Sequence, residues 1–314
     1  MPIVNTQVPV TAASCEKMIQ EITERYPFCR KELLTTTAFQ RPISMLTIGT
    51  GPRKVLFTAA HHANEWITAL VLLKYAEDLA EAIQNDGILF GQRARPMAEA
   101  VTICMIPMMD PDGVDLVVGA IQPGEAQYES ARKLAQDYPN VPFPNGWKAN
   151  LLGVDLNLNY PAGWLQAREI KFSQGYTTPG PRDYVGRAPL DQMETKALAE
   201  FTEDFDPALV LAYHSQGKEI YWQFRDYFVS GAKELGEVMA RVSGYRLADT
   251  PYESSFAGYK DWFIQCFRRP GYTVEVGSGV NPLPLSQFPE IYRDNVPLLN
   301  IAALGIETAN TKED

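Results

Sequence analysis

Histidine is scarce in this chain, which has only three in 314 residues. The four cysteines show neither metal-ligand spacing nor a Cys-x-x-Cys motif, so we expect free thiols in a reducing compartment. No apolar run approaches the roughly 20 residues that a membrane helix needs, and residues 1–7 lack the charged region and apolar core of a secretory signal. We therefore expect no membrane association and a cytoplasmic location.

Basic residues are also in short supply. Lys and Arg total 28 against 38 Asp and Glu, which gives a net charge of −10 and a pI near 5.0. This balance argues against a nucleic-acid partner, so any anionic substrate must meet local cations. Repeats and long linkers are lacking as well, and a chain of this length can bury one substantial core. We predict one α/β domain over residues 1–314 and leave the oligomeric state open.

What the chain does have is His62 and Glu65 at a strand-to-helix junction. Residues 54–60 form a short apolar, strand-like run, and residues 65–76 have helical character. Residues three apart lie on the same side of a helical turn, so both side chains can reach one ion while His61 points elsewhere. Alone, the pair is weak, because His-x-x-Glu is frequent by chance and Glu65 could simply be favoured by the helix dipole.

Two further strand-like runs carry residues of the same kind. His214 follows the apolar run 207–213, although a histidine at a strand end is more often a hydrogen-bonded core residue than a ligand. Glu275 lies inside the run 271–277, where an unpaired carboxylate would be costly to bury. In open α/β sheets, sites gather beyond the carboxyl ends of strands. Two imidazoles and one carboxylate are a frequent ligand set of catalytic zinc, whose fourth position is left to water.

The order of motifs along nearly the whole chain resembles the zinc carboxypeptidase family, typified by carboxypeptidase A. The motifs are His62-x-x-Glu65, Asp110-Pro111-Asp112-Gly113, Gly153-Val154-Asp155-Leu156-Asn157, His214-Ser215, Asp261-Trp262 and Thr273-Val274-Glu275. Each is weak, but the ordered set is strong. The resemblance implies a single-domain α/β three-layer sandwich with a mixed, mostly parallel central sheet.

The resemblance also implies a role for each matching residue. His62, Glu65 and His214 would hold one Zn²⁺ per chain, and Glu275 would be the general base of a peptide hydrolysis. Such a base takes a proton from the attacking water and returns it to the leaving amine. Asp155 would orient His62 by accepting its other ring N–H. A set of imidazole and carboxylate ligands suits zinc, so we expect zinc as the metal.

Two departures from the family pattern affect the expected substrate. The arginine that clamps a substrate's C-terminal carboxylate in the family is replaced by Leu158, which offers no donor. The arginine that stabilises the oxyanion appears as Lys148, after Trp147, and a lysine can still act as a point charge. An ordinary metallocarboxypeptidase is therefore a less favoured alternative.

Several stretches are similar to a branch of the family that cuts murein peptides. They are Trp147-Lys148-Ala149-Asn150, Tyr160-Pro161-Ala162-Gly163-Trp164 and Pro181-Arg182-Asp183-Tyr184-Val185-Gly186. This similarity implies a γ-D-glutamyl-L-diamino acid peptidase whose substrate is a murein tri- or tetrapeptide with meso-diaminopimelate or lysine. An N-acyl amino acid deacylase and a catalytically silent muropeptide-binding protein remain as alternatives. Retention of Glu275 favours an enzyme.

The substrate contacts are less well marked. Lys260 takes the position of the residue that sets specificity in the family, and it would favour an acidic group; its alternative is a solvated surface lysine. Asn157 and Arg182 are further candidates for binding substrate, as are Arg268 and Arg269. Tyr252 resembles the family's mobile tyrosine, with a spacing to Asp261 that is one residue longer.

Three segments outside these motifs also carry expectations. Residues 13–26 read as an amphipathic helix, and residues 125–138 can form a helix within a loose region. Residues 160–189 read as one long loop with aromatic residues. Loops of that length in compact domains are usually functional, so we assign this one to the rim of a substrate cleft.

Overall fold

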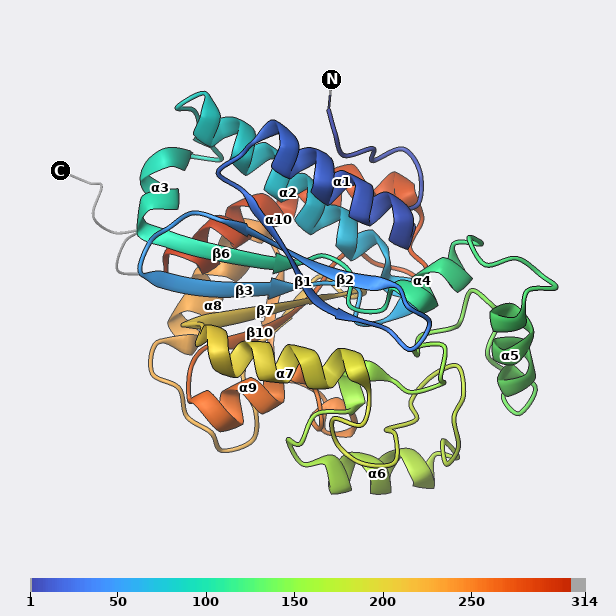
Figure 1. Cartoon of the computed structure of the whole chain (residues 1–314). Coiled ribbons are helices and arrows are strands. Elements are labelled where there is room, and N and C mark those ends of the chain that lie inside the picture. Colours follow the sequence, from blue (N-terminus) through green and yellow to red (C-terminus); the bar gives the residue numbers. More distant parts are fainter. Residues whose placement is uncertain (1, 306–314) are drawn as a thin grey trace.

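The computed structural model describes residues 2–305, and one eight-stranded sheet lies at its centre (Figure 1). The strand order is β1-β2-β6-β3-β7-β10-β8-β9. The strands are β1 Arg30–Thr36, β2 Pro42–Ile48, β3 Arg53–Thr58, β6 Val101–Ile106, β7 Leu209–His214, β8 Glu219–Tyr221, β9 Arg246–Ala248 and β10 Gly271–Glu275. A separate two-stranded sheet pairs β4 Ile88–Leu89 with β5 Gln92–Arg93.

The middle of the large sheet is parallel. Strands β6, β3, β7 and β10 run side by side in one direction, β8 and β9 are parallel to each other, and the remaining pairs are antiparallel. The predicted mixed, mostly parallel sheet is confirmed. The predicted runs 54–60, 207–213 and 271–277 correspond to β3, β7 and β10, with ends that differ by up to two residues. Because these neighbours are parallel, their carboxyl ends meet at one edge of the sheet.

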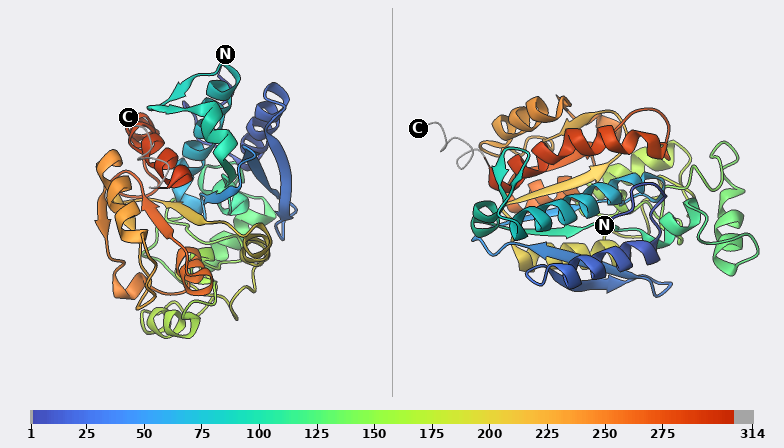
Figure 2. Two further views of the ribbon diagram at one scale, coloured as in Figure 1. Left: turned by 90° about the vertical axis from the view of Figure 1, so that its left-hand side faces the viewer. Right: turned by 90° about the horizontal axis from the view of Figure 1, so that it is seen from above.

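Helices cover both faces of the sheet, which gives three layers (Figures 1 and 2). Helices α1, α2, α3, α8 and α10 lie on one face, and α7 and α9 lie on the other. The helices are α1 Ala12–Arg25, α2 Ile67–Gln84, α3 Ala94–Ala100, α4 Pro111–Val117, α5 Ala126–Ala135, α6 Trp164–Ser173, α7 Met193–Phe205, α8 Ala232–Ser243, α9 Tyr259–Phe267 and α10 Phe288–Leu304. Short 3₁₀ turns are η1 Ala63–Glu65, η2 Leu156–Leu158, η3 Tyr252–Ser254 and η4 Leu285–Gln287.

The alternation of side chains along β7 explains why its sequence is apolar throughout. Leu211 and Tyr213 pack in the core beneath α2 and α10, whereas Val210 and Ala212 pack in the core beneath α7 and α9. A strand covered on both faces needs apolar residues at every position. By the same alternation, His214 shares the face of Val210 and Ala212.

The helices predicted over residues 13–26 and 125–138 are confirmed as α1 and α5. Helix α1 opens with a capping box, in which Ser14 N–H donates to the Thr11 hydroxyl and Thr11 N–H donates to that of Ser14. Helix α5 lies within the predicted run 125–138. The helix read over 65–76 instead begins after η1 and continues to Gln84. No helix in residues 2–305 is long and apolar enough to cross a membrane.

The prediction of one long loop over residues 160–189 is wrong in part. Residues 164–173 form α6, which begins after Gly163 in a left-handed conformation (φ 67°). The helix buries Trp164 and Ala167 in the core beneath α7 and α9. The apolar face of α6 is too narrow to show a clear helical period in the sequence. The surrounding Gly and Pro residues therefore indicate a loop over the whole segment.

Candidate active site

A turn directly after β3 brings His62 and Glu65 together. His62 has extended backbone (φ −115°, ψ 134°) and precedes η1, whose Glu65 N–H donates to the carbonyl of His62 at 3.1 Å. This compact turn leaves Nδ1 of His62 2.9 Å from Oε1 of Glu65. The convergence predicted from their spacing is confirmed.

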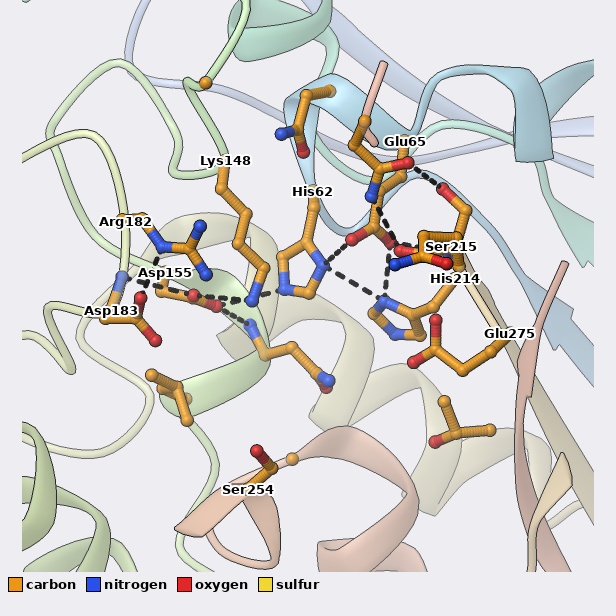
Figure 3. A pocket seen from close by; sticks show the side chains of 18 of the residues that line it. His62, Glu65, Lys148, Asp155, Arg182, Asp183, His214, Ser215, Ser254 and Glu275 are labelled. Carbon is orange, nitrogen blue, oxygen red and sulfur yellow. Dashed lines mark hydrogen bonds and ion pairs between the residues drawn. The ribbon is translucent and has the colours of Figure 1, made fainter. Parts of the chain in front are cut away.

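His214 reaches the same point from β7. Strand β7 is parallel to β3 with Ala212 opposite Thr58, so His214 emerges at the edge where β3 ends. Nδ1 of His214 lies 3.0 Å from Oε2 of Glu65 and 3.1 Å from Nδ1 of His62 (Figure 3). Glu65 also accepts the backbone N–H of Ser215 at 3.1 Å. Both oxygens of this carboxylate therefore face the histidines.

These three side chains fit a zinc ion. Their ligand atoms lie within 4.8 Å of one another, and the residues are no more than 4% exposed. Burial by itself would raise the pKa of Glu65, but the two neighbouring imidazoles outweigh burial and lower it, so the group is a carboxylate. Burial lowers the pKa of His214, which favours the neutral form that binds metal. Two imidazoles and a carboxylate leave a fourth zinc position open.

The third histidine stands behind this set, and its ring stacks against that of His214 with 5.7 Å between centroids. His61 is fully buried, and its ring stacks against that of Tyr259 with 5.8 Å between centroids. Its Nε2 atom lies 3.5 Å from the hydroxyl of Tyr160. Burial lowers the pKa of His61 well below its ordinary value, so this histidine is neutral packing behind the ligands.

Asp155 links the ligand His62 to Lys148. Its Oδ1 lies 3.1 Å from Nε2 of His62, and its Oδ2 lies 3.2 Å from Nζ of Lys148. With Nε2 of His62 donating to this carboxylate, Nδ1 keeps a lone pair toward Glu65 and His214. Burial would lower the pKa of Lys148, but the carboxylates of Asp155, Asp183 and Glu65 more than offset it and raise the pKa. Lys148 is therefore an ammonium directed at the site.

Glu275 lies on the opposite side of the ligand set from Lys148 (Figure 3). It ends β10 in parallel register with His214, so its carboxylate emerges beside the ligands. Burial and the neighbouring Glu65 raise the pKa of Glu275 to about 8. A cation held by Glu65 and the histidines would lower this pKa again by Coulomb attraction. The predicted general base thus lies where a proton acceptor is needed, and its catalytic role stays a prediction.

A cavity of about 910 Å³ opens over these residues. The three ligands lie on its floor together with Lys148, Asp155 and Glu275. The 140–146 loop after α5 forms one wall, and residues 279–282 after β10 form another. Its volume suits a short peptide with branched or charged groups.

The predicted substrate residues Asn157, Lys260 and Arg182 all line this cavity. Oδ1 of Asn157 accepts the Tyr259 N–H at 3.0 Å, which fixes the amide at the wall. Lys260 is 3% exposed, and its ammonium lies 2.6 Å from Asp261, so the alternative of a solvated surface lysine is wrong. Arg182 borders the cavity beside Asp183. Substrate contact by these three residues stays a prediction.

Tyr252, Arg268 and Arg269 lie elsewhere. Tyr252 is 70% exposed in η3 and borders a second cavity of about 530 Å³, where its ring meets Phe256 edge-on. Arg268 stacks on the ring of Tyr227 at 4.0 Å, and Arg269 pairs with the exposed Asp206. Neither arginine is among the residues that line the main cavity, so both are wrong as candidates for binding substrate there. A contact of Tyr252 with substrate stays a prediction.

Sequence reasoning missed Lys171 and Asp183. Asp183 is buried, and its carboxylate pairs with Lys171 at 2.8 Å and with Arg182 at 2.6 Å. Both missed residues line the cavity. Lys171 comes from α6, inside residues 160–189, for which the sequence predicts a loop and shows no helical face. Asp183 directly follows Arg182 in a quoted motif, and that adjacency of opposite charges was the available signal.

Comparison with known proteins agrees with this site. Residues 15–297 match the zinc carboxypeptidase family. The chain is 40% identical over 278 residues to gamma-D-glutamyl-L-diamino acid endopeptidase 1 of Lysinibacillus sphaericus, covering 88% of this chain and 67% of that protein. An uncharacterized protein of Bacillus subtilis (strain 168) is 34% identical over 282 residues, covering 89% of this chain and 73% of that protein. The crystal structure of thrombin activatable fibrinolysis inhibitor superposes with a TM-score of 0.76 at 16% identity, covering 96% of this chain and 76% of that one, which shows the fold alone.

A three-layer α/β fold with two histidines and a glutamate at the carboxyl ends of its strands defines the zinc-dependent hydrolases of this architecture. The chain belongs to the zinc carboxypeptidase family. It is a zinc metallopeptidase whose metal ligands are His62, Glu65 and His214.

Proposed function

We propose that this peptidase hydrolyses the bond between γ-D-glutamate and an L-diamino acid in murein peptides. The observation that carries this proposal is the 40% identity, over 88% of the chain, to an enzyme named for that activity. The substrate is a tri- or tetrapeptide with meso-diaminopimelate or lysine at the third position. The chemistry of the cavity supports the proposal at three points.

The first point is the presence of every group that amide hydrolysis needs. His62, Glu65 and His214 would hold the zinc ion, which would supply an activated water molecule by lowering its pKa to about 7. Glu275 takes a proton from the attacking water and returns it to the leaving amine. Lys148 stabilises the negative charge that develops on the carbonyl oxygen. Asp155 keeps His62 in the tautomer and orientation that the site requires.

The second point is the position of Leu158, which lines the cavity and is 7% exposed. An apolar side chain there gives no bidentate partner to the carboxylate of a protein C-terminus. A tetrapeptide, whose chain continues beyond the diamino acid, loses nothing at this position, whereas a tripeptide ends in the carboxylate of its diamino acid. Leu158 therefore favours an endopeptidase over an ordinary carboxypeptidase.

The third point is the charge of the cavity wall. On the Arg182 side of the cavity, Lys148, Lys171 and Arg182 lie around the two carboxylates of Asp155 and Asp183, so these five residues together carry one positive charge in excess. The chain as a whole carries a net charge of −10, so this local excess stands out. Murein peptides carry several free carboxylates, which such a wall attracts.

The proposal is tested by incubating zinc-loaded protein with L-Ala-γ-D-Glu-meso-diaminopimelate and identifying the products by mass spectrometry. We expect release of diaminopimelate, its loss with a chelator and its return when zinc is added. An α-linked glutamyl peptide of the same composition should stay intact. Release of an amino acid from the α-linked peptide alone would overturn the proposal in favour of an ordinary carboxypeptidase.

The Glu275→Gln variant separates an enzyme from a silent binding protein. It should retain one zinc per chain by metal analysis and lose product release by 10²- to 10⁴-fold, roughly the range for a general base. Glu237→Gln, on the exposed side of α8, is the matched control. A cytoplasmic location, in which the enzyme meets recycled wall fragments, stays a prediction.

A further inference from the structure

Four cationic side chains line the main cavity, and they differ in how far their charge is already used. They are Lys148, Lys171, Arg182 and Lys260. A γ-D-glutamyl substrate brings carboxylates into this cavity, so the cation with unused donors is the one to recognise them. This inference rests on the proposed function and assigns the recognition to one residue.

The ammonium groups of Lys260 and Lys171 are already bound by protein partners, so few of their donors remain for a substrate. The Lys260 ammonium is paired with Asp261 at 2.6 Å, donates to the carbonyl of Gln223 at 2.7 Å, and its side chain is 4% exposed. Lys171 is paired with Asp183 at 2.8 Å, and its side chain is 11% exposed. Both charges serve buried ion pairs behind the surface of the cavity. Lys148 faces the ligand set and suits the carbonyl oxygen.

Arg182 differs from these lysines because its partner, Asp183, binds only the Nε atom of the guanidinium. Nε donates to Oδ2 of Asp183 at 2.6 Å, and the side chain is 41% exposed. Asp183 is fixed in turn, since its other oxygen pairs with Lys171. Within residues 2–305, Asp183 is the one carboxylate in ion-pair contact with Arg182. The two terminal nitrogens therefore form a held, open fork of the kind that fits a carboxylate.

We propose that Arg182 binds the free α-carboxylate of the γ-linked D-glutamyl residue. In a γ linkage this carboxylate lies on the acyl side, and three carbon atoms separate it from the scissile carbonyl. Arg182 lies on the Lys148 side of the ligand set, away from Glu275, which serves the leaving amine (Figure 3). A carbonyl oxygen directed at Lys148 thus places the acyl side chain toward Arg182. An α-linked glutamyl peptide carries its free carboxylate at the same separation from the scissile carbonyl, so the fork recognises the carboxylate and not the linkage itself.

The distal carboxylate of diaminopimelate is the other possible source of the same chemistry. This carboxylate belongs to the leaving amine, which lies next to Glu275 and therefore on the side of the site away from Arg182. Three peptides separate the two sources. The reference contains γ-D-glutamate and diaminopimelate, the second carries the glutamyl α-carboxamide, and the third has lysine in place of diaminopimelate.

For the wild-type enzyme, we expect kcat/KM to fall roughly 10- to 100-fold from the carboxylate to the carboxamide peptide. Arg182→Gln should remove this ratio by lowering the rate on the carboxylate peptide and leaving the carboxamide peptide nearly unchanged. Arg182→Lys should keep part of the ratio, because charge remains and the fork is lost. Arg187→Gln, an exposed arginine five residues on, is the matched control and should keep the full ratio. Because each ratio compares two peptides on one protein, partial unfolding of a variant cancels.

Binding gives a second readout that does not depend on turnover. In a Glu275→Gln background, the Kd of the carboxylate peptide should rise by a similar factor when Arg182→Gln is added. The inference is overturned if Arg182→Gln keeps the wild-type ratio between the carboxylate and carboxamide peptides. It is also overturned if Arg182→Gln removes a preference for the diaminopimelate peptide over the lysine peptide instead. In both cases the proposed function stands, because wild-type protein cleaves the reference peptide. No cleavage of any of the three peptides by zinc-loaded wild type would overturn the proposed function itself.

Discussion

The two oxygens of Asp155 hold two different groups of the site. Oδ1 lies 3.1 Å from the ligand His62, and Oδ2 lies 3.2 Å from Lys148. The carboxylate is fully buried, so water does not weaken either contact. Burial would raise the pKa of Asp155, but Lys148 and His62 lower it well below its ordinary value. One buried charge thus aligns a metal ligand with the group that faces the carbonyl oxygen.

Asp155→Asn should therefore weaken both zinc binding and turnover. The amide oxygen can still accept from His62, but the amide nitrogen then faces Lys148 as a second donor. We expect a loss of about 10- to 100-fold in zinc affinity or in kcat/KM. Competition with a metal chelator measures the first, and steady-state kinetics measures the second. Asp204→Asn, on the exposed surface of α7, should change neither. Wild-type values for both quantities would show that Asp155 does not orient the site.

Lys148→Met should act on turnover and not on the metal. Methionine keeps much of the volume and removes the charge that faces the carbonyl oxygen. Loss of one oxyanion donor costs about 3 to 4 kcal/mol of barrier, so we expect turnover to slow by roughly a hundredfold to a thousandfold. Zinc content should remain one per chain, and Lys148→Arg should restore much of the rate. Turnover by Lys148→Met within a few-fold of the wild-type rate would exclude this role.

The convergence of the metal ligands and Glu275 could be predicted because the carboxyl ends of neighbouring parallel strands meet at one edge of the sheet. The apolar runs that precede His62 and His214, and the run that contains Glu275, had to finish at one edge of a parallel sheet. No comparable rule places the residues of long connections. Lys171 reaches the cavity from a helix in a segment that the sequence predicts as loop, and Tyr252 lies at a neighbouring cavity. Their positions depend on how the connecting segments pack, which short motifs do not encode.

Lys260 shows the same limit and yields a prediction about stability. Its position suggested a specificity residue, but its ammonium forms a buried pair with Asp261. Removing one partner of a buried ion pair leaves the other charge uncompensated, which costs about 3 to 5 kcal/mol. Lys260→Met should therefore lower the free energy of unfolding by that amount in urea titrations. The double variant Lys260→Met with Asp261→Asn should recover part of it. A single variant as stable as wild type, with a changed preference among substrates, would instead support the prediction that Lys260 sets specificity.

Glu194 gives a prediction about pH that is independent of the metal. It lies near the start of α7, is 3% exposed, and burial raises its pKa to about 7 from the ordinary 4.5. The folded protein therefore holds a proton here that the unfolded chain has released between these two values. The stability that this proton contributes is full below about pH 4.5 and is lost as pH rises toward about 7, on the order of 3 kcal/mol in all.

Glu194→Gln should remove this dependence, because a neutral amide of similar shape has no proton to lose. Asn150 donates to Glu194 at 3.4 Å, and the amide oxygen of glutamine can accept the same bond. We expect the variant to be more stable than wild type at pH 7.5 and nearly equal to it at pH 4.5, measured by urea denaturation at each pH. Glu200→Gln, exposed on the same helix, should follow wild type throughout. If Glu194→Gln keeps the wild-type slope between pH 4.5 and 7, the carboxyl is ionised in the folded protein and its burial is compensated in another way.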